Sequence, residues 1–205
     1  MRVPGRHAEA FTVSAHARAR AASLQHRCSS AGARFAGMTE APPDRRNRAD
    51  GSERETLESF LDDYRDIVVR KVSGLSDADA RRRLVSSPTT VGGLVKHLRW
   101  AEYGWFDQLL QERISDNRRT HDRAWEFEFL PEESLATLVA DYRTQCDESR
   151  RIAARYPLDH AVPHVRLGQV SLRWMYVHMI EETARHTGQL DILREQLDGT
   201  TGFAG

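Results

Sequence analysis

Two histidines and a glutamate near the carboxyl end of the chain have the spacing of a metal-binding helix face. His178, Glu182 and His186 follow one another at steps of four in the segment His-Met-Ile-Glu-Glu-Thr-Ala-Arg-His. Because an α-helix turns about 100° per residue, steps of four return side chains to nearly the same face. Histidine nitrogen and carboxylate oxygen are the usual ligands of catalytic zinc, which keeps one coordination position open. The segment therefore predicts part of a divalent-metal site.

A further candidate ligand, His97, lies far upstream on another segment with helical spacing. A lone histidine on an apolar stripe is more often a hydrogen-bonded core residue than a ligand. Glu182 strengthens the metal interpretation, since a buried carboxylate is costly unless it is paired or coordinates a metal. Helix packing would have to bring His97 onto Glu182 and His186 for the three residues to share an ion.

The alternative is a solvated helix face, in which Glu181 and Glu182 pair with Arg185 or Arg173. Histidine and glutamate at helical spacing also occur by chance. The residues alone leave both interpretations open.

The elements that must position these residues are four long helices. Ser52 with Glu55 predicts a capping box at the first helix, and Asp198-Gly199 ends the last one. Without convincing strand pairs, the pattern predicts an all-α four-helix bundle. Apolar residues recur at helical spacing from Glu53 to Leu75, from Thr90 to Arg113, from Pro131 to Tyr156 and from Ser171 to Leu197, with a short turn at Asp77 to Leu84.

Two long connections, 114–130 and 157–170, separate the last three predicted helices. In the first connection, Trp125, Phe127 and Phe129 alternate with other residues and allow one extended piece. Connections of this length indicate crossover wiring and not a simple up-down-up-down bundle.

The first 50 residues differ in composition from the rest of the chain. Residues 1–37 contain six arginines and a single acidic residue, Glu9, with little apolar periodicity. Such a stretch buries too little surface to offset its ordering entropy, and a transit peptide has a similar composition. We expect residues 1–50 to be a poorly ordered extension or a mis-assigned start upstream of Met38, and residues 51–205 to form the bundle.

The global composition argues against several classes of partner. The 205 residues have a formal net charge of zero and a pI near 7.1, so nothing points to nucleic acid or an anionic membrane. No apolar run approaches the length of a membrane span. Cys28 and Cys146 form no motif, which favours free thiols in a reducing compartment. We therefore expect a cytoplasmic protein.

The chain from about Asp50 to Gly202 resembles the DinB/YfiT-like superfamily of four-helix metal-binding proteins, and in particular its uncharacterised branch in high-GC actinobacteria. Basic charge that is almost entirely arginine is typical of a GC-rich genome. The resemblance is carried by Thr90-Val-Gly-Gly-Leu-Val-Lys-His-Leu98, Ser171-Leu-Arg-Trp-Met175, His178-Met-Ile-Glu-Glu-Thr-Ala-Arg-His-Thr-Gly188 and Asp191-Ile-Leu-Arg-Glu195.

The resemblance implies a ligand set. The usual triad of the superfamily is one histidine from the second helix and two histidines four apart on the last helix, the second before a Gly-Gln pair. By this register His97 and His186 match, and the remaining position falls on Glu182, where the family has histidine. Glutamate ligates zinc in two-His-one-Glu sites, and its harder oxygen also allows nickel, manganese or iron.

The resemblance also suggests roles for the residues around this triad. Gln189 could support the ligands, and His178 is better placed for a packed or supporting role than for a fourth ligand. His121, His160 and His164 lie in predicted connections, where they could be solvated or reach over the mouth of the bundle.

The function implied by the resemblance is thiol chemistry. Relatives include S-transferases that use mycothiol or bacillithiol, and maleylpyruvate isomerases. An open metal site would bind the cofactor thiol, promote its deprotonation and hold the thiolate for attack on an electrophile, or could activate water for hydrolysis. We expect a divalent-metal-dependent enzyme, with zinc first, acting on a small-molecule thiol such as mycothiol and an electrophile. The alternatives are a non-enzymatic, stress-associated protein with a structural metal site, and a bundle without metal.

Aromatic residues near the end of the second predicted helix are too numerous for one inner face. Trp100, Tyr103, Trp105 and Phe106 fall within two turns. Those that the core does not use could line a pocket or a homodimer contact.

Overall fold

Four long helices begin where a serine or threonine side chain caps the first turn. Each capping oxygen accepts a backbone N–H that the helix would otherwise leave unpaired. The capping box of Ser52 and Glu55 is present as predicted, and the last helix ends at Gly199, which has a positive φ of 78°. The four helices are α3 (Glu53–Val72), α5 (Val91–Glu102), α6 (Leu135–Ala153) and α7 (Leu172–Asp198), capped by Ser52, Thr90, Ser134 and Ser171 respectively.

The computed structural model describes residues 50–113 and 123–202. Within these ranges the chain is mostly helical and has one small sheet, which confirms the predicted all-α four-helix class. Apart from Asp50, the predicted extension over residues 1–50 lies outside the described residues, as does His121. Among the described helices, none combines the length and the apolar character needed to cross a lipid bilayer.

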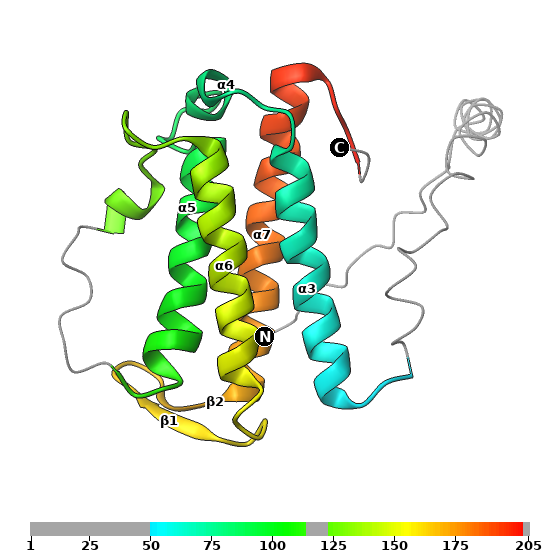
Figure 1. Cartoon of the computed structure of the whole chain (residues 1–205), viewed down its shortest axis with the longest axis vertical. Coiled ribbons are helices and arrows are strands. Elements are labelled where there is room, and N and C mark those ends of the chain that lie inside the picture. The colour runs from blue at the N-terminus through cyan, green and yellow to red at the C-terminus, as the bar shows by residue number, and fades with distance from the viewer. Residues whose placement is uncertain (1–49, 114–122, 203–205) are drawn as a thin grey trace, which may run out of the picture. The chain divides into compact units, whose positions relative to one another are not determined.

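One crossover connection determines how the helices are wired (Figure 1). α3 and α7 run parallel, because Glu53 at the start of α3 pairs with Arg173 and Lys71 near its end pairs with Asp191. α5 and α6 run parallel to each other in the opposite direction. α5 and α6 therefore begin at the same end of the bundle, which makes the connection between them a crossover, as the length of the first predicted connection indicated. A short helix, α4 (Asp77–Arg81), joins α3 to α5.

The second long connection contains a β-hairpin, so the prediction of no strand pairs was wrong at this position. β1 (Ala161–His164) and β2 (Gly168–Ser171) pair antiparallel and lead directly into α7. Gly168 has a φ of 76°, and the paired Val162 and Val170 are both buried. Strands this short give too little periodicity to be distinguished from a loop in the sequence.

The first connection also differs from its predicted conformation. Trp125, Phe127 and Phe129 allowed an extended piece, whereas Arg123–Phe127 is a 3-10 turn, η2. An alternating pattern does not separate a short extended segment from a tight turn whose rings pack on a neighbouring helix. α6 then begins at Leu135 and not directly after Pro131.

The second predicted helix changes its hydrogen-bonding pattern part of the way along. After α5 ends at Glu102, the chain continues as a π-helical segment, η1 (Tyr103–Leu109). π-helical turns are rare and often occur at functional sites. The segment carries Trp105, which packs against rings from β1 and α7.

The core consists of two hydrophobic clusters and a buried ion pair. Arg65 of α3 donates from Nε and Nη2 to the two carboxylate oxygens of Glu102 in α5, at 2.8 and 2.6 Å. This bidentate geometry satisfies charges that would be costly to bury alone. One cluster includes Val68, Leu94, Leu98, Tyr142 and Leu190, and the other includes Leu61, Phe106, Ile152, Met175 and Met179.

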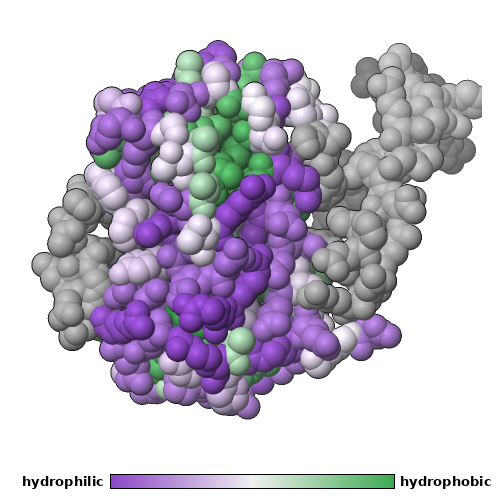
Figure 2. Space-filling model, viewed as in Figure 1, coloured by the Kyte–Doolittle hydropathy of each residue, from purple (hydrophilic) through white to green (hydrophobic). Residues whose placement is uncertain are grey.

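The surface in the orientation of Figure 1 is mostly hydrophilic (Figure 2). One hydrophobic strip lies toward the end of the bundle that carries α4. The polar surface agrees with the charged composition of the chain.

Candidate metal centre

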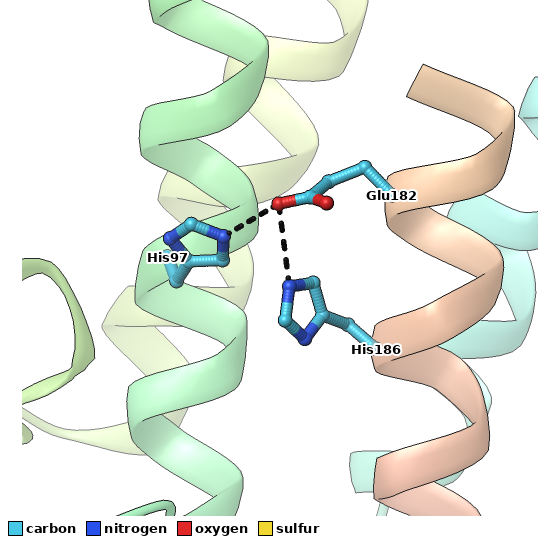
Figure 3. A group of neighbouring side chains, drawn as sticks. All are labelled: His97, Glu182 and His186. Atoms are coloured by element: carbon cyan, nitrogen blue, oxygen red, sulfur yellow. Dashed lines mark hydrogen bonds and ion pairs between the residues drawn. The ribbon is translucent and has the colours of Figure 1, made fainter. Parts of the chain in front are cut away.

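His97 of α5 meets Glu182 and His186 of α7 where these two helices lie against each other (Figure 3). Oε1 of Glu182 is 3.0 Å from Nε2 of His97 and 3.3 Å from Nε2 of His186. The two imidazole rings have centroids 4.8 Å apart and meet at 74°. Helix packing therefore brings together the three residues that the family resemblance implied, with both Nε2 atoms facing one carboxylate oxygen.

The polar residues on α7 extend an apolar stripe of the same helix. Met175 and Met179 are fully buried, and His186 follows on the same face with 7% of its surface exposed. Glu182 lies between them, with 19% of its side chain exposed. A carboxylate in this position needs partners, and the two histidines provide them.

Burial and charge act against each other on these groups. Burial lowers the pKa of His97, but the carboxylates of Glu126 and Glu182 outweigh it and raise the pKa above its usual value. Hydrogen bonds from His186 and His97 hold the pKa of Glu182 well below its usual range, against the effect of burial. Glu182 is therefore ionised and the site is a charged cluster within the bundle.

The outer nitrogen of each histidine faces an oxygen. Nδ1 of His186 lies 2.7 Å from Oε1 of Gln189, one turn further along α7. Nδ1 of His97 lies 3.4 Å from Oε2 of Glu126. Gln189 therefore takes the supporting position that the family resemblance suggested for it.

Glu126 is the residue of this cluster that sequence reasoning missed. It comes from η2, in the long connection, and the next residue, Phe127, stacks on the His97 ring at a centroid distance of 4.0 Å and an angle of 16°. The only sequence signal was a carboxylate between two aromatic residues, Trp125 and Phe127. A contact across a connection of this length has no periodic signature.

Two glycines allow this part of the connection to lie directly on α5. A Cβ added at Gly92 would overlap the ring of Phe129, and one added at Gly93 would overlap the carbonyl oxygen of Phe127. Gly92-Gly93 therefore serves close backbone approach, and this approach places Glu126 and Phe127 against His97.

The other histidines of the described residues, His160, His164 and His178, do not join the triad. His178 is packed between Trp105 and Trp174, with ring centroids at 4.6 and 5.1 Å, and His164 of β1 lies parallel to Trp105 at 5.7 Å. Burial lowers the pKa of His178, against the opposing charge of Glu182. The structure thus gives His178 a packed position, and His160 packs on Tyr156 at 4.6 Å.

The alternative prediction of a solvated helix face, with glutamates paired to arginines, holds for the neighbours of the triad but not for Glu182 itself. Glu181 is exposed and pairs with Arg185 at 2.6 Å. Arg173 pairs with Glu53 and Asp159 at the surface. Glu182 instead makes its described contacts with the two histidines.

The donor set fits a divalent ion. The three donor atoms lie within 4.8 Å of one another, and neighbouring donors in a tetrahedral zinc site are about 3.4 Å apart. His186 has an oxygen at each ring nitrogen, Gln189 at Nδ1 and Glu182 at Nε2, and a neutral imidazole with one N–H cannot donate to both. Either a protonated ring or a cation in place of the Nε2 proton satisfies this arrangement, and two histidines beside one carboxylate supply the nitrogen and oxygen donors that such a cation prefers.

The one cysteine among the described residues is unsuited to nucleophilic chemistry. Cys146 lies in α6 with 3% of its surface exposed. Burial raises the pKa of its thiol strongly, and Glu102 adds to the shift while Arg65 opposes it. A thiol in this environment stays protonated and unreactive. Within the described residues, the chain therefore supplies no reactive sulfur of its own.

Comparison with known proteins identifies the family. A search of curated proteins found no match. The family model for mycothiol-S-transferases matches residues 56–199, which include the four long helices from Thr56 onward and the residues of the candidate metal centre. The match covers most of the chain and all three residues of the triad, and we conclude that this protein belongs to the mycothiol-S-transferase family.

Proposed function

We propose that this protein is a divalent-metal-dependent thiol S-transferase in which His97, Glu182 and His186 hold the ion. The observation that carries the proposal is the convergence of two Nε2 atoms on one carboxylate oxygen, at 3.0 and 3.3 Å, within a mycothiol-S-transferase family member. Zinc is the first candidate, and nickel, manganese and iron are the others.

The number of protein donors favours a catalytic site over a structural one. Among the described residues, three donors meet, whereas structural zinc sites are closed by four protein ligands. A fourth position is then left for a small molecule. A divalent ion held by the triad would coordinate a thiol sulfur at this fourth position, lower the pKa of that thiol and hold the thiolate for reaction.

The residues of the chain have defined tasks in such a reaction. Glu182 and the two histidines provide the donors, and Gln189 keeps the His186 ring oriented through Nδ1. Cys146, the one cysteine among the described residues, is buried and protonated and does not compete as a nucleophile. We assign the reacting sulfur to the small-molecule thiol, with mycothiol as the proposed one. Transfer forms a bond from sulfur to the electrophile, breaks the bond to its leaving group and releases the thiol proton to solvent.

The experiment is elemental analysis by mass spectrometry of untagged protein, followed by an assay of mycothiol conjugation to monobromobimane. We expect about one equivalent of a transition metal and metal-dependent conjugation. Glu182→Ala should lose both, while Glu181→Ala, which changes the exposed neighbouring carboxylate, should keep both. Protein that binds a metal but accelerates no thiol conjugation would favour the non-enzymatic alternative. Protein that takes up neither zinc, nickel nor manganese would refute the site.

A further inference from the structure

We propose that Glu126 is a positioning residue for the metal centre, acting through His97. This inference rests on the proposed metal site but adds a residue from outside the helices that carry the ligands. The juxtaposition that suggests it is a carboxylate at the outer nitrogen of one proposed ligand, supplied by the long crossover connection.

The geometry places the His97 ring between two carboxylates. Nε2 is hydrogen-bonded to Oε1 of Glu182 at 3.0 Å, and Nδ1 faces Oε2 of Glu126 at 3.4 Å as an ion pair without hydrogen-bond geometry. The Glu126 side chain is only 13% exposed, so little water competes for this contact. A carboxylate on the outer nitrogen of a metal-bound histidine fixes its tautomer, orients the ring and increases its basicity as a ligand.

Consecutive residues restrain the edge and the face of the same ring. Glu126 contacts the Nδ1 edge, and Phe127 stacks on the ring plane at a centroid distance of 4.0 Å. The Phe127 ring also lies 6.1 Å from that of His186. Restraint of both edge and face leaves Nε2 aimed at Glu182, which is the orientation that the metal needs.

The segment that carries Glu126 is held on α5 by contacts that do not involve its carboxylate. Nζ of Lys96, which is buried, donates to the Glu128 carbonyl at 3.0 Å, pairs with Glu133 at 2.9 Å and lies 3.7 Å from the centroid of the Trp125 ring. Close approach at Gly92 and Gly93 adds further contacts. These contacts do not depend on the Glu126 carboxylate, so the segment should stay in place when that carboxylate is removed.

The two histidines are supported unequally. The partner of His186 is a neutral amide from the same helix, whereas the partner of His97 is a carboxylate from a separate segment. A charged acceptor polarises the ring more strongly than an amide. Because linkage is reciprocal, an ion that binds more tightly when Glu126 is docked must also stabilise the docking of Glu126 by the same factor.

The test compares zinc affinity in wild type, Glu126→Ala, Glu126→Gln and Glu128→Ala, measured by competition with a chromogenic chelator. Glu128 is an exposed carboxylate two residues along the same segment and serves as the matched control. We expect Glu126→Ala to weaken zinc binding by about 10–100-fold. Glu126→Gln, which keeps an acceptor oxygen but no charge, should lose less, and Glu128→Ala should stay within about twofold of wild type.

Two further measurements separate positioning from a loss of structure. The visible absorption of bound Co²⁺ should shift in Glu126→Ala, since that spectrum reports ligand geometry, while helical circular dichroism stays unchanged. Amide exchange over residues 123–129 should slow when metal is added to wild type but not to Glu126→Ala.

The outcomes distinguish this inference from the proposed function. If wild type binds zinc and Glu126→Ala binds it within twofold with an unaltered Co²⁺ spectrum, the role of Glu126 is refuted and the metal site stands. If wild type binds neither zinc nor Co²⁺, the metal site is refuted and the role of Glu126 with it.

Discussion

At the scale of single residues, the centre is organised around one oxygen. Oε1 of Glu182 accepts from both His97 and His186, whereas a histidine in its place would offer a ring nitrogen and no charge. The charge of Glu182, together with that of Glu126, raises the pKa of His97 against the effect of burial. The departure from three histidines therefore changes the electrostatics of the site while keeping three donors.

Zinc affinity in His186→Ala and in His178→Ala should distinguish the proposed ligand, His186, from its neighbour, His178. His186 faces Glu182, and its loss removes one of three donors, so zinc affinity should fall by more than about 100-fold. His178 packs between two tryptophans and should be dispensable for metal, with affinity within a few-fold of wild type. Elemental analysis measures the metal content of each variant, and chelator competition measures its zinc affinity. Full occupancy in His186→Ala would refute the assigned triad.

Cys146 should be inert toward alkylation in the native protein. Burial keeps its thiol protonated, and only the thiolate reacts with iodoacetamide. In a Cys28→Ser background, intact-mass spectrometry at pH 8 should detect no adduct in native protein and one adduct after unfolding in guanidinium chloride. Rapid native labelling would show that the α6 core opens far more readily than its burial indicates.

At the scale of elements, the contact between the crossover connection and α5 positions the residues that support His97. The glycines at the start of α5 remove the side chains that would hold Phe127 and Phe129 away, and the segment then reaches His97. The helix that supplies a ligand thus also provides the docking surface for the residues that support that ligand. A change at this contact should affect metal binding without altering any donor.

Gly93→Ala should destabilise the protein and weaken zinc binding, since the added methyl group would overlap the Phe127 carbonyl. Overpacking of this kind costs about 1–3 kcal/mol. Gly188→Ala is the matched control, because its Cβ would meet no atom within 4 Å inside α7. It should stabilise the helix by about 0.5–1 kcal/mol and leave affinity unchanged. Urea unfolding and chelator competition provide the two readouts. Equal stability and equal zinc affinity in Gly93→Ala and Gly188→Ala would contradict a tight contact at Gly93.

At the scale of the whole domain, we expect stability to come mainly from the hydrophobic clusters and not from the metal centre. The clusters include residues of all four long helices, and the triad belongs to neither. The Arg65–Glu102 pair adds a polar link between α3 and α5 that is independent of metal. A structural zinc site, in contrast, would contribute directly to folding.

Removal of metal by a chelator should therefore leave helical circular dichroism unchanged and lower the melting temperature. At free zinc of about 100 times Kd, binding to the folded state alone adds about 2.7 kcal/mol. Thermal melts over a series of buffered zinc concentrations measure this linkage. Loss of helical signal on chelation would identify a structural ion instead.

Much of this organisation could be predicted from the sequence, because it depends on local periodicity. The caps at Ser52 and Gly199, the four helices and the His97, Glu182 and His186 cluster follow from helical spacing and the family resemblance. Assignment of a metal to the cluster, the homodimer and the cytoplasmic location stay predictions.

The features that could not be predicted depend on contacts distant in sequence. The β1–β2 hairpin is too short to show a pattern, and the π-helical segment leaves no signature in residue type. Glu126 reaches His97 only because a long connection folds back onto α5, and no spacing rule relates two such positions.

The placement of the tryptophans has a practical consequence for spectroscopy. All four, Trp100, Trp105, Trp125 and Trp174, lie on α5, η1, η2 or α7, and none lies on α3 or α6. Trp100 and Trp125 contact each other. Trp105 and Trp174 pack with His178, which lies four residues before Glu182 in the sequence. Ultraviolet emission of the native protein therefore reports on the half of the bundle that holds the triad. Titration with a quenching ion such as Co²⁺ should reveal occupancy through this emission, without any attached label.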